Sequence, residues 1–229
     1  MAWPADNLMA AASVANYNKL NGNKYSDFIE AWVKQVKGSL DSHGLIPHRT
    51  FSGSTEMVEG ARGSSQSLML SVLAEVDAEM ARSHFQKYKE LFLVYRVGLP
   101  GILEYPKGKE GSGDIDSGPV LFGVGGSASI VGIKAFNIHG DFNTATGIRN
   151  SVEAFGLPVS VGGKKRYLLG KMPMADAFIA WSHASFSPDE KMNDFDWSES
   201  WKAKFLIPSW AVFGILLTIL GFSFYRNRV

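Results

Sequence analysis

The sequence predicts an all-α fold of helical hairpins, with one small β-hairpin and a single C-terminal transmembrane helix. Apolar residues recur at the spacing of amphipathic helices through most of the chain. Helices that begin near Asn7, Ser65, Ser117 and Ala175 follow one another at intervals of roughly 50 to 60 residues. A long uncharged run near the C-terminus is the third observation. The predicted parts are a helical domain (residues 1–186), an acidic linker (187–204), a membrane span (205–225) and a short basic tail (226–229).

The first hairpin is predicted from residues 8–20, which are rich in alanine, and residues 25–40. Asp6 and Asn7 precede the first segment, where such side chains commonly cap helices. The second segment places its apolar residues at i, i+3 and i+4 spacing, which is typical of an amphipathic helix; these residues are Phe28, Ile29, Trp32, Val33 and Val36.

The second hairpin is predicted from residues 68–80 and 81–97, after a polar loop over residues 50–60. The first of these segments is apolar on one face, and the second presents lysines and glutamates outward. Residues 99–101, Leu-Pro-Gly, break the second helix.

A glycine-rich loop over residues 111–119 leads into the third hairpin and carries two carboxylates, Asp114 and Asp116. Proline is favoured at the first helical position, so the sequence predicts a helix that begins at Pro119 with Asp116 or Ser117 as its N-cap.

The remaining elements follow from the same patterns. We expect the third hairpin to comprise residues 119–139 and 143–155. Short β-like runs around Gly162 and Gly163 predict a β-hairpin over residues 159–169. A fourth helix is expected over residues 172–183.

Residues 205–225 contain no charged side chain, and about 20 apolar residues suffice to span a bilayer as a helix. Trp210 and Tyr225 lie where interfacial aromatic residues are common, and Arg226 and Arg228 follow. The sequence therefore predicts a membrane anchor. The side of the membrane stays undetermined because the flanking basic residues balance.

Each repeated hairpin pairs a helix rich in small residues with a more amphipathic one, as in an α/α toroid whose inner helices are closely packed. The loops before the inner helices would then meet at one mouth. We expect this mouth to hold ten polar residues: Asp6, Asn7, Glu59, Arg62, Ser64, Glu104, Tyr105, Asp114, Asp116 and Asp176.

Several carboxylates beside a tyrosine and an arginine suit acid/base catalysis, because burial and like charges separate carboxyl pKa values. Asp114 or Asp116 is the predicted catalytic acid or base, with Glu104 and Tyr105 next. The other six residues are predicted to bind substrate: Asp6, Asn7, Glu59, Arg62, Ser64 and Asp176.

Short motifs also resemble a known family. Residues 4–7 (Pro-Ala-Asp-Asn), the helix around residues 28–32, and residues 113–118 (Gly-Asp-Ile-Asp-Ser-Gly) before a small-residue helix resemble the linalool dehydratase/isomerase-like family. The likeness covers roughly residues 3–155. It implies an α/α toroid with lyase or isomerase activity, although the cysteines of the characterised dehydratase pocket have no counterpart here. Since a complete toroid of this kind has six hairpins, it also implies a homo-oligomeric ring or a missing N-terminal half.

Composition and motifs restrict the classes of partner, metal and cofactor that the sequence predicts. Without Arg226 and Arg228, 21 basic residues face 22 acidic ones, which argues against nucleic acid as a partner. The chain has no cysteine, and its five histidines lack zinc-site spacing, so we expect no metal and no cofactor. His48 and His139 lie near loop ends and are candidates to join a pocket. Residues 123–128 match a dinucleotide fingerprint, but the βαβ context is missing.

Two classes of function stay open at this stage. One is a membrane-anchored enzyme that acts on a hydroxylated small molecule or sugar by elimination, isomerisation or hydrolysis. The other is a non-catalytic ligand-binding or scaffold domain, or a fragment of a larger toroid. Paired carboxyls facing each other would favour the enzyme, whereas carboxylates that only cap helices would favour the scaffold.

Overall fold

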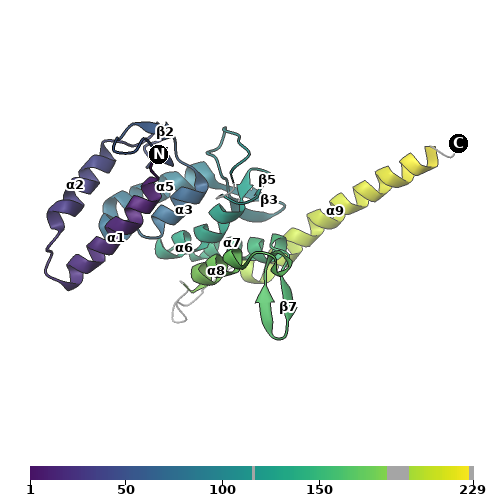
Figure 1. Ribbon diagram of the computed structural model, residues 1–229. Coiled ribbons are helices and arrows are strands. Elements are labelled where there is room, and N and C mark those ends of the chain that lie inside the picture. The colour runs from purple at the N-terminus through teal and green to yellow at the C-terminus, as the bar shows by residue number, and fades with distance from the viewer. Residues whose placement is uncertain (115–116, 185–195, 227–229) are drawn as a thin grey trace.

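The computed structural model describes residues 1–114, 117–184 and 196–226. Helices make up 59% of these residues, which confirms a mostly helical fold, and the described residues also form four short antiparallel hairpins where the sequence predicted one. A long helix projects from one side of the helical part, as Figure 1 shows.

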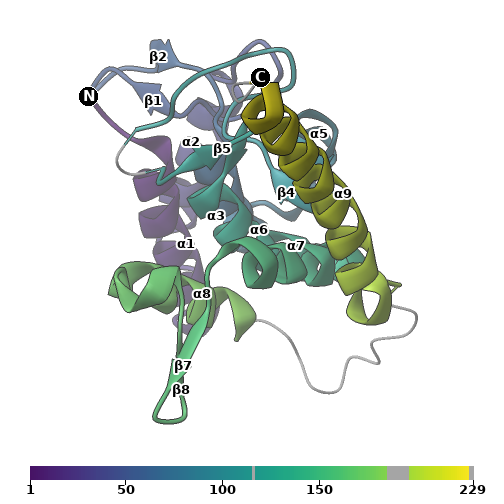
Figure 2. The same cartoon turned by 90° about the vertical axis from the view of Figure 1, so that its right-hand side faces the viewer.

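The helices predicted to open each hairpin lie in a row. α3 (Gly63–Leu70) packs between α1 (Pro4–Leu20) and α6 (Gly126–Ile138), and α6 also contacts α8 (Pro173–His183). Their partners extend the layer: α2 (Ser26–Lys37) lies on α1, α5 (Ala78–Phe92) on α3 and the short α4 (Leu73–Val76), and α7 (Phe142–Phe155) on α6. Figure 1 shows these helices following one another across the helical part, and Figure 2 views them from the side on which α9 projects.

Small residues let these helices approach closely. A methyl group at Gly132 of α6 would lie 3.1 Å from Ile102 and 3.2 Å from the Tyr88 hydroxyl of α5, so a larger side chain would force these neighbours to shift. Large buried side chains fill the space around this contact, among them Phe85, Tyr88, Phe92 and Phe136. A second cluster around Leu8, Ile46, Met69 and Leu73 joins α1 to α3 and α4.

Four two-stranded hairpins connect the helices: β1 (Arg49–Thr50) with β2 (Met57–Glu59), β3 (Leu93–Arg96) with β4 (Leu99–Ile102), β5 (Val120–Leu121) with β6 (Val124–Gly125), and β7 (Val159–Val161) with β8 (Lys164–Arg166). The last of these is the hairpin predicted over residues 159–169. Its tip is Gly162-Gly163, where φ is +57° and +74°.

The other hairpins correct the predicted helix bounds. α5 ends at Phe92 rather than Val97, because residues 93–102 form β3 and β4. α6 begins at Gly126 rather than Pro119, because residues 120–125 form β5 and β6. Its N-cap is therefore Gly125, and the prediction of Asp116 or Ser117 as the cap was wrong.

Two further bounds differ. The helix predicted over residues 68–80 is divided into α3 and α4, and α3 already begins at Gly63. Asp6 and Asn7 lie inside the first turn of α1, whose N-cap is Trp3, so they do not cap it as predicted.

The C-terminal helix α9 (Asp196–Arg226) contains a 22-residue segment, Phe205–Arg226, of mean hydropathy 2.1. This segment is long and apolar enough to cross a membrane. Phe205 packs edge-on against Phe155 of α7, with ring centroids 5.2 Å apart. Of the predicted linker (187–204), residues 187–195 lie outside the described residues, and residues 196–204 belong to α9.

Candidate functional site

Arg62 lies at the centre of a polar cluster between α3 and the loop after β4. Its side chain is 3% exposed. Nε donates to Glu104 Oε1 at 2.9 Å, and Nη1 donates to Asp114 Oδ2 at 2.6 Å. Glu59 Oε1 lies 3.6 Å from the same Nη1. Three carboxylates thus share one guanidinium group, and we call these four residues with His48, Ser64 and Tyr105 the Arg62 cluster.

The backbone around Arg62 explains how these residues meet. Arg62 is the extended N-cap residue of α3, and the next N–H, that of Gly63, donates to the Glu104 carbonyl at 2.8 Å. A methyl group at Gly63 would lie 1.9 Å from the Leu103 carbonyl oxygen, so only glycine fits this contact. The Glu104 N–H in turn donates to the Gly123 carbonyl at 2.9 Å.

Glu104 is completely buried. Its Oε1 accepts hydrogen bonds from Arg62 and from Ser64 Oγ, the latter at 2.7 Å. Within the described part of the chain its Oε2 has no hydrogen-bond partner, and a methyl group at Gly125 would lie 2.6 Å from it. Burial raises the pKa of Glu104 above its ordinary value, although Ser64 and Arg62 act in the opposite direction.

Asp114 has the opposite environment. Its side chain is 46% exposed, and Oδ1 accepts a hydrogen bond from the Ser117 N–H at 2.9 Å. Partial burial opposes ionisation, but the bonds from Ser117 and Arg62 outweigh it and lower the pKa of Asp114 to about 2. Asp114 is therefore an accessible carboxylate that is ionised at neutral pH.

An aromatic ring and an imidazole complete the cluster. The Tyr105 ring centroid lies 5.1 Å from the Arg62 guanidinium carbon. Gly111 lies against this ring so closely that a methyl group there would be 2.4 Å from it. His48 Nε2 lies 3.5 Å from Arg62 Nη1, and His48 Nδ1 lies 3.1 Å from Ser65 Oγ. Burial lowers the pKa of His48, with a further contribution from Arg62.

The structure thus brings six of the ten predicted site residues together: Glu59, Arg62, Ser64, Glu104, Tyr105 and Asp114. Asp6 and Asn7 are exposed in the first turn of α1. Asp176 lies in α8, where it accepts hydrogen bonds from the Tyr167 N–H and Arg166. Asp116 lies outside the described residues. The catalytic and binding roles of all ten stay predictions.

Of the two histidines near loop ends, only His48 joins the cluster. His139 stacks on Phe85 with ring centroids 4.4 Å apart, and its Nε2 lies 3.3 Å from the Leu70 carbonyl. Sequence reasoning missed the part that Gly63, Gly111 and Gly125 play in bringing the backbone close to Glu104 and Tyr105. Glycines in the loops beside charged residues were the available signal.

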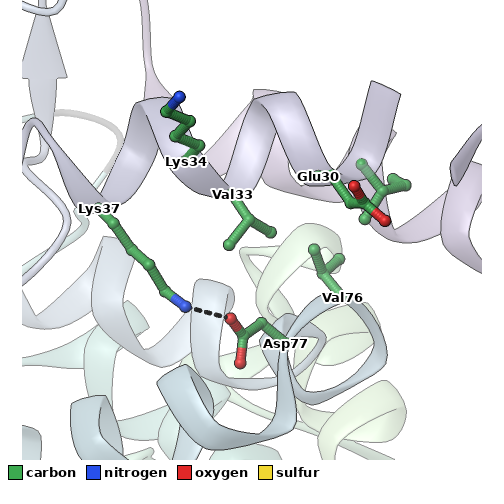
Figure 3. Close-up of a pocket in the computed structure, with 7 residues that line it drawn as sticks. Glu30, Val33, Lys34, Lys37, Val76 and Asp77 are labelled. Atoms are coloured by element: carbon green, nitrogen blue, oxygen red, sulfur yellow. Dashed lines mark ion pairs between the residues drawn. The ribbon is translucent and has the colours of Figure 1, made fainter. Parts of the chain in front are cut away.

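A shallow groove lies elsewhere, between α2 and the end of α4 (Figure 3). Apolar side chains and the Lys37–Asp77 ion pair, 2.8 Å long, form most of its lining. None of the ten predicted site residues lines it, so the groove does not belong to the candidate site.

No protein-family model and no curated protein matches this chain. The resemblance to the linalool dehydratase/isomerase-like family therefore rests on the short motifs alone.

Proposed function

We propose that this chain is a membrane-anchored enzyme that transforms a hydroxylated small molecule or a sugar by acid/base chemistry at the Arg62 cluster. The observation that carries the proposal is the pair of carboxylates, Glu104 and Asp114, on one guanidinium group. The pKa of Glu104 is raised and that of Asp114 is lowered. Environments that push two carboxyl pKa values apart distinguish a proton donor from a proton acceptor.

Each residue then has a role. Asp114, exposed and ionised, accepts a proton from the ligand in an elimination or isomerisation, or from the attacking water in a hydrolysis. Glu104, whose raised pKa favours its protonated form, donates a proton to the leaving oxygen, and Arg62 holds both carboxyl groups in position. Both carboxyl groups contact the same guanidinium group, so they belong to one site, as the paired carboxyls of glycoside hydrolysis do. The same pair suits elimination or isomerisation of an alcohol.

One observation favours a second candidate, a non-catalytic ligand-binding or scaffold domain. Glu104 has no exposed surface, so a ligand does not touch it in this conformation. In that case the Arg62–Glu104 pair only holds α3 to the loop after β4.

The scaffold in both proposals is an arc of an α/α toroid. The adjacent inner helices α1, α3, α6 and α8, each of the first three with an outer partner, support this proposal. A second copy of the chain, or further hairpins, would complete the ring. Light scattering of the full chain in detergent micelles measures the mass of the particle. A closed homo-oligomer has a defined mass, so this measurement tests whether a second copy completes the ring.

The membrane part of the proposal rests on the segment Phe205–Arg226, which is uncharged up to its last residue and is exposed. A spanning helix resists extraction of membranes with alkaline carbonate. Recovery of the full chain in the soluble fraction would contradict the anchor.

The catalytic proposal is tested with the full chain in micelles against panels of sugars and terpenoid alcohols. Asp114→Asn should lower turnover by about 10²- to 10⁴-fold, the usual contribution of an acid/base group. Asp27→Asn is the matched control, since it makes the same change at an exposed residue of α2, outside the cluster and the predicted site, and should retain turnover. A ligand that raises the unfolding temperature without being transformed would favour the binding domain instead.

A further inference from the structure

Two neighbouring hairpin tips expose apolar side chains. Tyr95 and Val97, at the β3–β4 tip, are 52% and 36% exposed. Leu121 and Phe122, at the β5–β6 tip, are 56% and 71% exposed. Arg96 links the tips, because its Nε donates to the Phe122 carbonyl at 3.4 Å. We call these five residues the tip patch.

The backbone indicates that the tips are not shaped by turn preference alone. Val97 and Phe122 have φ values of +50° and +51°, in the left-handed region that disfavours bulky side chains. Each precedes a glycine in a two-residue turn. The β7–β8 hairpin has the same two-residue turn and fills it with Gly162 and Gly163, the favoured choice. Val97 and Phe122 thus keep bulky side chains on exposed turns despite backbone strain, as Leu157 and Leu169 do elsewhere, so the inference depends on the position of the tips.

The tip patch is continuous with the proposed membrane anchor. α9 contacts β4, and β4 pairs with β3 and contacts β6. In Figures 1 and 2 the β3–β4 and β5–β6 hairpins lie beside α9, on the side from which α9 leaves the helical part. The β7–β8 hairpin points away from the direction in which α9 runs.

We propose that the tip patch inserts into the interfacial layer of the bilayer that α9 crosses. Tyrosine is favoured at this depth, and an arginine can extend its charged group to lipid phosphates while its stem lies among apolar groups. Leu121 and Phe122 would enter the acyl boundary. The inference rests on the proposed membrane span, and continuity with that span favours a lipid surface over a protein partner.

Insertion would also place the Arg62 cluster near the bilayer. Glu104 donates its N–H to the carbonyl of Gly123, the residue after Phe122. The candidate site is thus connected to the inserted tip by the backbone of the loop after β4.

Because the chain has no cysteine, single labelling sites are easily introduced. We would make Phe122→Cys, Leu121→Cys, Ile215→Cys and Val161→Cys in the full chain and attach an environment-sensitive fluorophore. The labelled proteins are reconstituted into phosphatidylcholine vesicles with and without brominated acyl chains. Val161 is the matched control, since it is apolar, 76% exposed and next to the Gly-Gly turn of β7–β8. Circular dichroism verifies that each variant folds.

The expected result is quenching at positions 215, 122 and 121, and no quenching at position 161. Quenching at 215 without quenching at 122 or 121 would overturn the tip patch and leave the anchor standing. Labels at 122 and 121 that are shielded from water but not quenched would indicate a protein partner, which also overturns the proposal. Absence of quenching at all four sites would refute the anchor, and the inference would fail with it. Equal quenching at 161 would contradict the orientation on which the inference depends.

Discussion

Two arginine–carboxylate pairs have nearly the same geometry and opposite surroundings. The Arg62–Glu104 pair is 2.9 Å long with side chains 3% and 0% exposed, whereas the Arg166–Asp176 pair is 3.1 Å long with side chains 50% and 14% exposed. Sequence reasoning assigned Glu104 and Asp176 to the same mouth. In the structure Glu104 is buried and Asp176 is partly exposed. This difference in burial decides how much each ion pair contributes to the stability of the fold.

The two pairs differ in the free energy that is lost when one charged partner is left unpaired. In the buried pair, removal of one partner leaves the other without water or a counter-charge. In the exposed pair, solvent and salt replace the lost partner. The following changes probe this difference, from the largest expected effect to the smallest.

Arg62→Ala should destabilise the fold by about 3–5 kcal/mol, because it leaves the Glu104 carboxylate buried without its ion pair. Denaturant unfolding of the full chain in micelles, followed by tryptophan fluorescence, measures the loss. Arg49→Ala is the control: its ion pair with Glu59 is 3.4 Å long and partly exposed. Equal losses in the two variants would show that burial of Arg62 carries no special cost.

Gly125→Ala should destabilise by about 1–3 kcal/mol through overpacking. The added methyl group would lie 2.6 Å from Glu104 Oε2, and Glu104 would have to move. The neighbouring change Gly126→Ala meets Pro119 at 3.4–3.5 Å and should be nearly neutral. The difference between the unfolding midpoints of the two variants measures how tightly Glu104 packs against Gly125. A Gly125→Ala variant as stable as Gly126→Ala would contradict this tight packing.

The pH dependence of stability should reveal Asp114. Its pKa of about 2 lies below the unfolded value of 3.8, so its contribution is present above about pH 4 and is lost as the pH falls toward 2. Because the side chain is nearly half exposed, we expect only about 1 kcal/mol. Asp114→Asn should therefore be less stable than wild type at pH 7, and the two curves should converge near pH 2. If the stabilities of wild type and Asp114→Asn changed in parallel with pH, the lowered pKa of Asp114 would be contradicted.

Glu104 should change the stability with pH in the opposite direction. A carboxyl with a raised pKa favours folding below its unfolded value, 4.5, and this advantage is lost as the pH rises through the folded-state pKa. Glu104→Gln retains hydrogen-bonding capacity without a titratable group, so it distinguishes the Glu104 part of the pH curve from the Asp114 part.

Periodicity predicted where most helices lie, because apolar spacing and polar loops are local features. It missed the β3–β4 and β5–β6 hairpins because Val97 and Phe122 occupy turn positions where glycine or asparagine is the usual signal. The candidate site was predictable as a set of residue types in loops. Which of these residues contact Arg62 could not be predicted, because this depends on non-local backbone contacts such as that of Gly63 with Glu104.

The smallest expected effect is that of Arg166→Ala. Arg166 is half exposed, and Asp176 retains its hydrogen bond from the Tyr167 N–H when the arginine is removed. The unfolding midpoint should therefore match wild type within error at physiological salt. Asp176→Ala removes that backbone bond as well and should be the more destabilising of the two changes. An Arg166→Ala loss as large as that of Arg62→Ala would mean that pair geometry, rather than burial, determines stability in this protein.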